Sequence, residues 1–243
     1  MDPEKVADIG SEFADLDPAT ERYAKRFSGP AGEWLLSRQT AALRQLIAPW
    51  PQGTVLDVGG GHGQVAKPLR DDGYNVHVLA SSDAALGRVT EMDGVQTKIG
   101  SLMTLPYADN SFDIVTSFRI LAHIGNWQNL VAELCRVARH AVIVDFPISG
   151  GANALEPLLF GIKKRVEGDT RRYQTMTHKS VQACMSENGF ARTDKIGQFV
   201  LPMVVHRKLN QPKISAPLEA TLGKLGLARL MGTPVVLCAK ASK

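Results

Sequence analysis

The chain has 243 residues, of which 44% are hydrophobic and 21% charged, and its net charge is +4. This composition is typical of a folded globular protein and argues against a disordered or fibrous chain. No apolar run reaches the ~18 residues that span a bilayer, and the acidic start lacks the pattern of a signal peptide. The cysteines, Cys135, Cys184 and Cys238, form no CxxC pair. This spacing excludes a disulfide framework and a thiolate zinc site, and it is typical of a cytoplasmic protein.

The N-terminal region is predicted to form a helical cap over residues 1–52. Its first 20 residues are acidic and aperiodic, so we expect a mobile end there. One helix is predicted over residues 18–48, because Pro18 can occupy its first turn and apolar residues recur on one face. The proline- and glycine-rich run at 49–53 ends it.

From Gly53 onward, short apolar strands alternate with helices. Strands are predicted at 54–58, 75–80, 95–99, 112–118 and 140–146, and helices at 63–72, 83–91 and 126–138. This alternation indicates an α/β fold with a parallel sheet and helices on both of its faces. Residues 53–146 are therefore the predicted ligand-binding core.

The alternation weakens after residue 146. Residues 147–176 and 201–232 are predicted to be insertions on the substrate side of a single domain that spans 1–243. The elements around them are a helix at 178–188, a strand at 190–201, a helix at 217–230 and a last strand at 234–239.

Positive charge gathers in this second part of the chain. Beyond Phe146 there are 15 Lys+Arg against 6 Asp+Glu. Both insertions place apolar residues before basic ones, at 155–165 and at 199–208. Two interpretations stay open: core packing with a solvated basic rim, or a site for an amphipathic acceptor with an anionic end, presented at a membrane surface. No basic run is long enough for a nucleic-acid tail, so a nucleic-acid partner is not expected.

One motif, VLDVGGGHG at 55–63, stands where a predicted strand runs into a helix. Glycines at such a turn let the backbone approach a ligand closely, and the following helix N-terminus presents free N–H groups. The run from Gly61 to Ala66 also fits the GxGxxA pattern of dinucleotide-binding turns, which alone is a weak indication.

The residues around this motif resemble those of class I S-adenosylmethionine-dependent methyltransferases, of the small-molecule, type 11-like group. Asp57 stands where that family's first motif has its acidic residue. Further similar segments follow in the family's order at 100–107, 109–115, 117–124 and 134–137. The resemblance implies a Rossmann-like three-layer sandwich with a seven-stranded, mostly parallel sheet whose last strand is antiparallel. It also implies S-adenosyl-L-methionine as the cofactor.

The resemblance further implies which residues contact the cofactor. Asp57 would fix the loop and the cofactor's amino group. The other implied contacts are Gly59, Gly61 and Gly63, against methionine and ribose; Ser101 and Leu102, beside adenine; and Phe118 and Arg119, after the fourth strand. Arg119 is alternatively an exposed side chain. Tyr23 and Arg26 of the cap would close over the site, unless this helix makes only core contacts.

The second strand departs from the family. It usually ends with an acidic residue that accepts both ribose hydroxyls, and the spacing from Gly63 places Ala80 there. Ser81 and Ser82 follow, and a hydroxyl is a weaker acceptor than a carboxylate. Either a serine substitutes or cofactor binding is weak.

The chemistry implied by the resemblance is in-line transfer of a methyl group to a small or lipid-like molecule. His123 is the candidate base, although a histidine at that place often serves only packing or capping. The chain lacks the Asn/Asp-Pro-Pro-Tyr/Phe motif of base and glutamine methylation, a Pro-Cys nucleophile and a carboxylate cluster for magnesium, so we expect a metal-free enzyme. The alternatives are a methyltransferase-fold protein that binds cofactor poorly and an RNA methyltransferase. The oligomeric state is not predicted.

Overall fold

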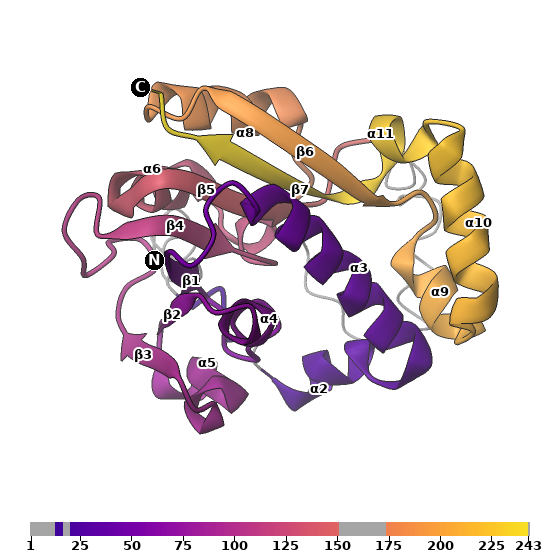
Figure 1. Ribbon diagram of the computed structural model, residues 1–243, viewed down its shortest axis with the longest axis horizontal. Helices are drawn as coiled ribbons and strands as arrows, with labels where there is room; N and C mark the ends of the chain where they lie inside the picture. The colour runs from indigo at the N-terminus through magenta and orange to yellow at the C-terminus, as the bar shows by residue number, and fades with distance from the viewer. Residues whose placement is uncertain (1–12, 17–19, 151–173, 243) are drawn as a thin grey trace, which may run out of the picture.

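The computed structural model describes residues 13–16, 20–150 and 174–242. A seven-stranded sheet with the order β3-β2-β1-β4-β5-β7-β6 forms its centre (Figure 1). The strands are β1 (Thr54–Val58), β2 (Asn75–Ala80), β3 (Val95–Ile99), β4 (Phe112–Ser117), β5 (Ala138–Phe146), β6 (Arg192–Phe199) and β7 (Thr233–Lys240). All pair in parallel except β7, which is antiparallel to both β5 and β6. The predicted sheet, including its antiparallel last strand, is confirmed.

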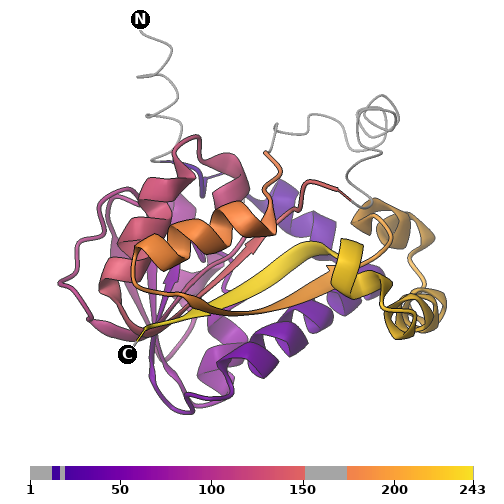
Figure 2. The same ribbon diagram turned by 90° about the horizontal axis from the view of Figure 1, so that it is seen from above.

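Helices cover both faces of the sheet (Figure 2). On one face lie α3 (Gly29–Ile47), α4 (Ala66–Asp71) and α5 (Asp83–Leu86); on the other lie α6 (Trp127–Val137) and α8 (His178–Glu187). Successive residues of a strand pack on opposite faces of the sheet: Val55 lies in the core on the α3 side and Leu56 in the core on the α6 side. A strand buried on both faces explains why these segments are almost continuously apolar.

The prediction of a single helix over 18–48 is wrong. The chain forms α2 (Glu21–Ala24), then a 3₁₀ helix (Lys25–Phe27), and starts α3 only after Ser28. Ser28 has extended backbone angles and Gly29 has φ +71°. The Phe27 backbone lies so close to α3 that a Cβ on Gly32 would come within 2.1 Å of it. The N-terminal turns therefore fold back against α3 and do not extend it.

The expectation of a mobile N-terminal end is wrong for residues 13–16. Ala14 and Asp15 are completely buried, and Ala14 packs with Leu79, Leu102 and Ile120 in the core on the α6 side. This short segment lies on the sheet although nothing in its own sequence marks it as a regular element.

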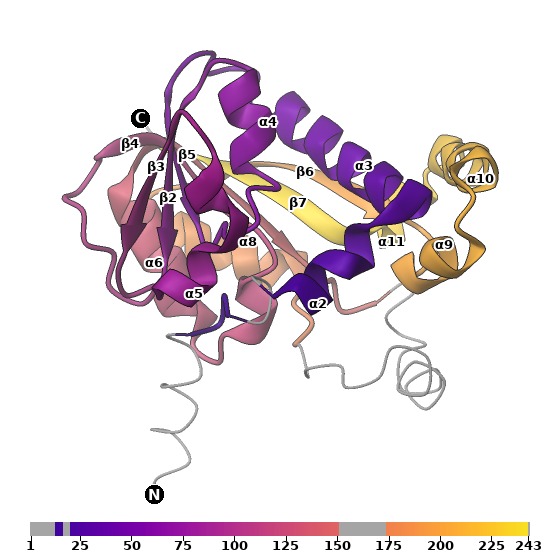
Figure 3. The ribbon, with the colours of Figure 1, turned by 90° about the horizontal axis from the view of Figure 1, so that it is seen from below.

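The predicted helix at 217–230 is replaced by two, α10 (Pro212–Lys224) and α11 (Leu227–Met231), and a third helix that was not predicted, α9 (Met203–Leu209), precedes them. Left-handed residues separate them, because Asn210 has φ +46° and Gly226 has φ +78°. Pro217 lies inside α10. These helices form one end of the molecule beside the start of α3 (Figure 3), where Asn210 Oδ1 accepts a hydrogen bond from the Ala31 N–H.

Among the described helices, none is long and apolar enough to cross a membrane. The apolar-then-basic run of the first insertion, 155–165, lies outside the described residues.

A buried carboxylate holds this helical end to the sheet. Glu219 of α10 accepts hydrogen bonds from the N–H groups of Val200 and Leu201, and from His206 Nε2 at 3.0 Å. His206, which belongs to the apolar-then-basic run at 199–208, is 1% exposed and also contacts Ser215 Oγ at 3.0 Å. Burial opposes ionisation of Glu219, but these hydrogen bonds outweigh it and lower the pKa of the carboxyl group.

We expect Glu219→Gln to lower the midpoint of thermal unfolding at pH 7 by about 4–8 °C, on the scale of ~2 kcal/mol for charged hydrogen bonds in a chain of this size. Because the pKa of Glu219 is lowered by folding, its stabilisation is present above its unfolded pKa. It is lost as the pH falls through its folded pKa. Thermal melts from pH 7 to pH 3 should therefore show the two proteins converging in acid. A constant difference at every pH would contradict this role.

Candidate functional site

The glycine loop follows β1 at the carboxyl edge of the sheet, where the strand order reverses between β1 and β4. Ligands of open parallel sheets bind at such a switch point. Gly59 has φ +82°, in the left-handed region that favours glycine. A Cβ on Gly60 would lie 1.9 Å from Asp57 Oδ2, so the Asp57 carboxylate occupies the space that a side chain there would need.

A pocket opens on this loop. Five residues named from the sequence line it together: Asp57, Gly59, Gly61, Phe118 and Arg119. Gln39 of α3 and His62 of the loop also line it, and sequence reasoning missed both. A helical pattern identifies Gln39 only as part of α3, and its place at the sheet edge depends on how α3 packs.

Asp57 is the most strongly perturbed group in the pocket. Its Oδ1 accepts a hydrogen bond from Thr116 Oγ1 at 2.9 Å, whereas its buried Oδ2 has no hydrogen-bond partner among the described residues. Burial, with a smaller contribution from Asp145, raises its pKa to about 7 against the hydrogen bond from Thr116 and the charge of Arg119. A buried carboxylate oxygen without a donor favours a cationic or N–H-bearing ligand group.

Arg119 links the cap to the sheet. It has φ +63°, and its N–H donates to Asp145 Oδ1 at 2.5 Å. Its guanidinium donates to Gln39 Oε1 and lies 4.1 Å from the centre of the Phe27 ring. Burial raises the pKa of Asp145 to about 6, and Arg119 opposes this shift. Arg119 is therefore held by α3 and the 3₁₀ helix, and it is not a freely exposed side chain.

We expect Arg119→Met to lower the midpoint of thermal unfolding by about 5–10 °C at pH 8, because two buried carboxyl groups lose their nearby cation. Without Arg119 both pKa values rise further, so the loss of stability grows as the pH increases through 6–7 and shrinks at pH 5. Melts of this variant, with Arg119→Lys as the charge-preserving control, measure the effect. An equal loss at pH 5 and pH 8 would assign Arg119 a packing role only.

The carboxyl end of β2 carries no acidic side chain of its own. β2 ends at Ala80, as the spacing predicts, but Ala80 is completely buried in the core. Ser82 caps α5, because its Oγ accepts a hydrogen bond from the Ala85 N–H at 3.3 Å. Ser81 donates its N–H and its hydroxyl to the Asp15 carboxylate, at 2.8 and 2.5 Å. A carboxylate therefore lies at this edge, supplied by the N-terminal segment.

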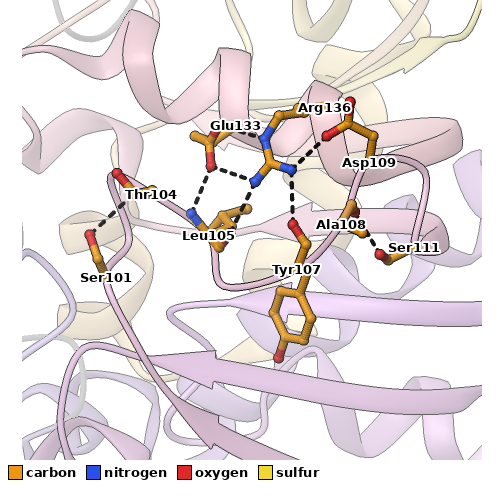
Figure 4. A network of polar contacts seen from close by, with 9 residues as sticks. All are labelled: Ser101, Thr104, Leu105, Tyr107, Ala108, Asp109, Ser111, Glu133 and Arg136. Atoms are coloured by element: carbon orange, nitrogen blue, oxygen red, sulfur yellow. Dashed lines mark hydrogen bonds and ion pairs between the residues drawn. The ribbon is translucent and has the colours of Figure 1, made fainter.

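The loop after β3 is fixed from α6 (Figure 4). Ser101 Oγ accepts hydrogen bonds from the N–H groups of Met103 and Thr104, both at 3.1 Å. Arg136 and Glu133 of α6 hold the Leu105 backbone farther along. Ser101 thus shapes the loop, and Leu102 is completely buried in the core. Gly63, with φ +67°, does not line the pocket, and a Cβ there would lie 2.3 Å from Met92 Cε.

Three other candidates lie outside the pocket lining. The Arg26 guanidinium lies 5.1 Å from the centre of the Tyr23 ring, and this ring lies 5.8 Å from that of Phe27. Phe27 and Arg119 therefore connect Tyr23 to the pocket. His123 ends the 3₁₀ helix Leu121–His123, which follows β4 at the same sheet edge. Among the described residues, no group of three His, Cys, Asp or Glu side chains could hold a metal ion.

Sequence comparison finds relatives for the segment that carries the loop. Residues 56–144 match a family profile described as "Methyltransferase domain". The chain is 32% identical over 158 residues to the glycine/sarcosine/dimethylglycine N-methyltransferase of Actinopolyspora halophila, covering 60% of this chain and 25% of that one. It is 31% identical over 138 residues to the demethylmenaquinone methyltransferase of Renibacterium salmoninarum, covering 52% and 58%. The chain thus spans between a quarter and three fifths of these relatives.

Solved structures share the fold. The magnesium protoporphyrin IX methyltransferase of Synechocystis, bound to S-adenosylhomocysteine, superposes with a TM-score of 0.64 at 13% identity, covering 98% of this chain and all of that one. An S-adenosylmethionine-dependent methyltransferase from Thermotoga maritima gives a TM-score of 0.61 at 15% identity, covering 95% and 100%.

Proposed function

We propose that this chain, whose residues 56–144 match a methyltransferase domain, is a class I S-adenosylmethionine-dependent methyltransferase that transfers the methyl group of that cofactor to a small or amphipathic acceptor without a metal ion. When bound, S-adenosylmethionine would supply a methyl group on a sulfonium centre: the acceptor nucleophile would bond to the methyl carbon in line as the carbon–sulfur bond breaks and the thioether of S-adenosylhomocysteine leaves. The contribution of the protein to such a reaction is positioning and exclusion of water.

The observation that carries this proposal is the unpartnered oxygen of Asp57 in the pocket on the glycine loop. An ammonium group is the donor that a buried carboxylate with a raised pKa favours, because pairing restores the ionised form. Gly59 and Gly61 give the ligand access to the backbone beside it. In this proposal Asp57 holds the amino group of the cofactor, and Phe118 and Arg119 border its methionine part.

The proposed acceptor is amphipathic with an anionic end, such as a quinone precursor. Four apolar side chains on α9 and α10 are 40–47% exposed: Val205, Leu209, Ile214 and Leu218. Basic residues flank them at Arg207, Lys208 and Lys213. Exposed apolar and basic groups together suit an amphipathic molecule taken from a membrane surface. The curated relatives include a demethylmenaquinone methyltransferase as well as an enzyme that methylates amino acids. Where the acceptor needs a base, we propose His123.

Two measurements test this proposal. Calorimetric titration with S-adenosylhomocysteine asks whether the pocket binds the cofactor, and we expect saturable one-to-one binding. Transfer of a radioactive methyl group is then compared between soluble amines and short-chain quinols in anionic vesicles, and we expect transfer to the quinols. His123→Ala should lower this transfer while sparing the binding of S-adenosylhomocysteine.

The outcomes separate the alternative functions. Absence of binding at millimolar S-adenosylhomocysteine would leave a methyltransferase fold without cofactor, and the proposal would be wrong. Binding with transfer only to amines would keep the enzyme and reject the amphipathic acceptor. Salt-dependent binding and methylation of RNA would favour the nucleic-acid alternative.

A further inference from the structure

Nothing in the sequence around Asp15 predicts that this residue lies at the edge of the sheet. It belongs to the segment 13–16, it is completely buried, and both of its carboxylate oxygens accept hydrogen bonds from Ser81. Ser81 is the first residue after β2, so the carboxylate stands at the carboxyl edge of the sheet. It borders the glycine loop as well, since its Cβ lies 3.5 Å from the place that a Cβ on Gly59 would take.

The end of the second strand has a defined use in nucleotide-binding sheets. An acidic residue there accepts hydrogen bonds from the hydroxyls of a ribose whose remaining groups lie along the glycine loop. The strand itself supplies no such group, because Ala80 is buried in the core and Ser82 caps α5. Asp83, the next acidic residue, is exposed in the first turn of α5.

We propose that Asp15 is the carboxylate that binds the vicinal hydroxyls of the cofactor's ribose, in place of an acidic residue on β2. This inference rests on the proposed function, because it assigns the nucleoside part of the same ligand. The two donors of Ser81 fix the carboxylate in one orientation. Each oxygen keeps a second lone pair, so a diol can add one hydrogen bond to each. Asp15 is a positioning residue for the cofactor and takes no part in methyl transfer.

The electrostatics of Asp15 agree with this role. Burial raises the pKa of its carboxyl group even though both hydrogen bonds from Ser81 oppose the shift. The carboxylate is therefore incompletely compensated by its protein donors, and two further O–H donors would favour its ionised form.

The test uses the whole chain and two ligands, S-adenosylhomocysteine and its 2′-deoxy counterpart, in calorimetric titrations at pH 8. The wild-type protein should bind the deoxy ligand ~10–30-fold more weakly, on the scale of one charge-assisted hydrogen bond. Asp15→Asn should bind S-adenosylhomocysteine ~10–30-fold more weakly than the wild type and should discriminate less than ~3-fold between the two ligands.

Two further variants serve as controls. Asp109 lies in the loop before β4, at the edge of the sheet opposite the glycine loop, and its carboxylate pairs with Arg136. Asp109→Asn should therefore leave the affinities for both ligands unchanged. Ser81→Ala removes the hydroxyl but keeps the Asp15 carboxylate and the backbone N–H that holds it, so it should keep the discrimination between the two ligands even if Asp15→Asn does not fold. Loss of the discrimination in Ser81→Ala would assign the diol to the Ser81 hydroxyl and overturn the inference.

Each of the following results would overturn the inference. Asp15→Asn could bind both ligands as the wild type does, or lose the same factor for both, so that the carboxylate does not contact the diol. Tighter binding by Asp15→Asn would show that the segment 13–16 obstructs the site. If the wild type bound S-adenosylhomocysteine without distinguishing the deoxy ligand, only this inference would fail, whereas no binding at all would remove the proposed function too.

Discussion

Asp57→Asn is expected to weaken binding of S-adenosylhomocysteine by ~10–100-fold, on the scale of a buried charge-assisted hydrogen bond, while making the free protein more stable. Asparagine keeps the acceptor for Thr116 Oγ1 but removes the charge that the ammonium group would pair with. Because folding raises the pKa of Asp57 to about 7, the native protein holds a proton that the unfolded chain has lost. The wild type therefore loses stability as the pH rises from about 4 to 7.

The pH profile makes this prediction specific. At pH 8 the thermal unfolding midpoint of Asp57→Asn should exceed that of the wild type, by ~2–4 °C for each kcal/mol of free energy of unfolding that the variant gains. Near pH 4 the two midpoints should be equal. Affinity of the wild type for S-adenosylhomocysteine should be about tenfold lower at pH 6 than at pH 8, since a group with a pKa of about 7 is mostly protonated at pH 6. Unchanged affinity in Asp57→Asn at pH 8 would show that the ammonium group binds elsewhere.

Gly61→Val is expected to remove detectable cofactor binding, a loss of at least ~100-fold, from a protein that still folds. Gly61 lines the pocket, and it is not among the glycines with positive φ, so a side chain there adds no left-handed strain. Because Gly61 and Asp57 line the same pocket, we expect a branched side chain at position 61 to take up space that the ligand needs. Titration with S-adenosylhomocysteine measures the loss, and thermal melts and circular dichroism confirm folding.

Gly223→Val is the matched control for Gly61→Val. Gly223 lies in α10, far along the chain from the glycine loop, with open space where a Cβ would lie. This change should leave the affinity for S-adenosylhomocysteine within about twofold of the wild type. Full binding by Gly61→Val would place the ligand away from the glycine loop and contradict the proposed site.

Local pattern predicted the central part of the fold well. Strands buried on both faces are continuously apolar, and glycines mark the turn after β1, so both features can be recognised over a few residues. The same reasoning failed where a local turn ends or divides a helix within a stretch of helical pattern. Residues 18–48 look like one helix until the approach of Phe27 to Gly32 is known. In the same way, Asn210 and Gly226 divide the C-terminal helices.

The seven-stranded sheet was implied by the family resemblance, whereas the alternation of strands and helices, the glycine loop with Asp57 and the end of β2 at Ala80 can be recognised directly in the sequence. These features depend on residues close together in the chain, whose order and spacing carry the information. The folded structure was needed to show that Arg119 joins the cap to Asp145, that His206 is buried beside Glu219, and that the carboxylate of Asp15 lies at Ser81. Each of these contacts depends on packing between separate segments, and the cost of burying a charge appears only once its three-dimensional surroundings are known.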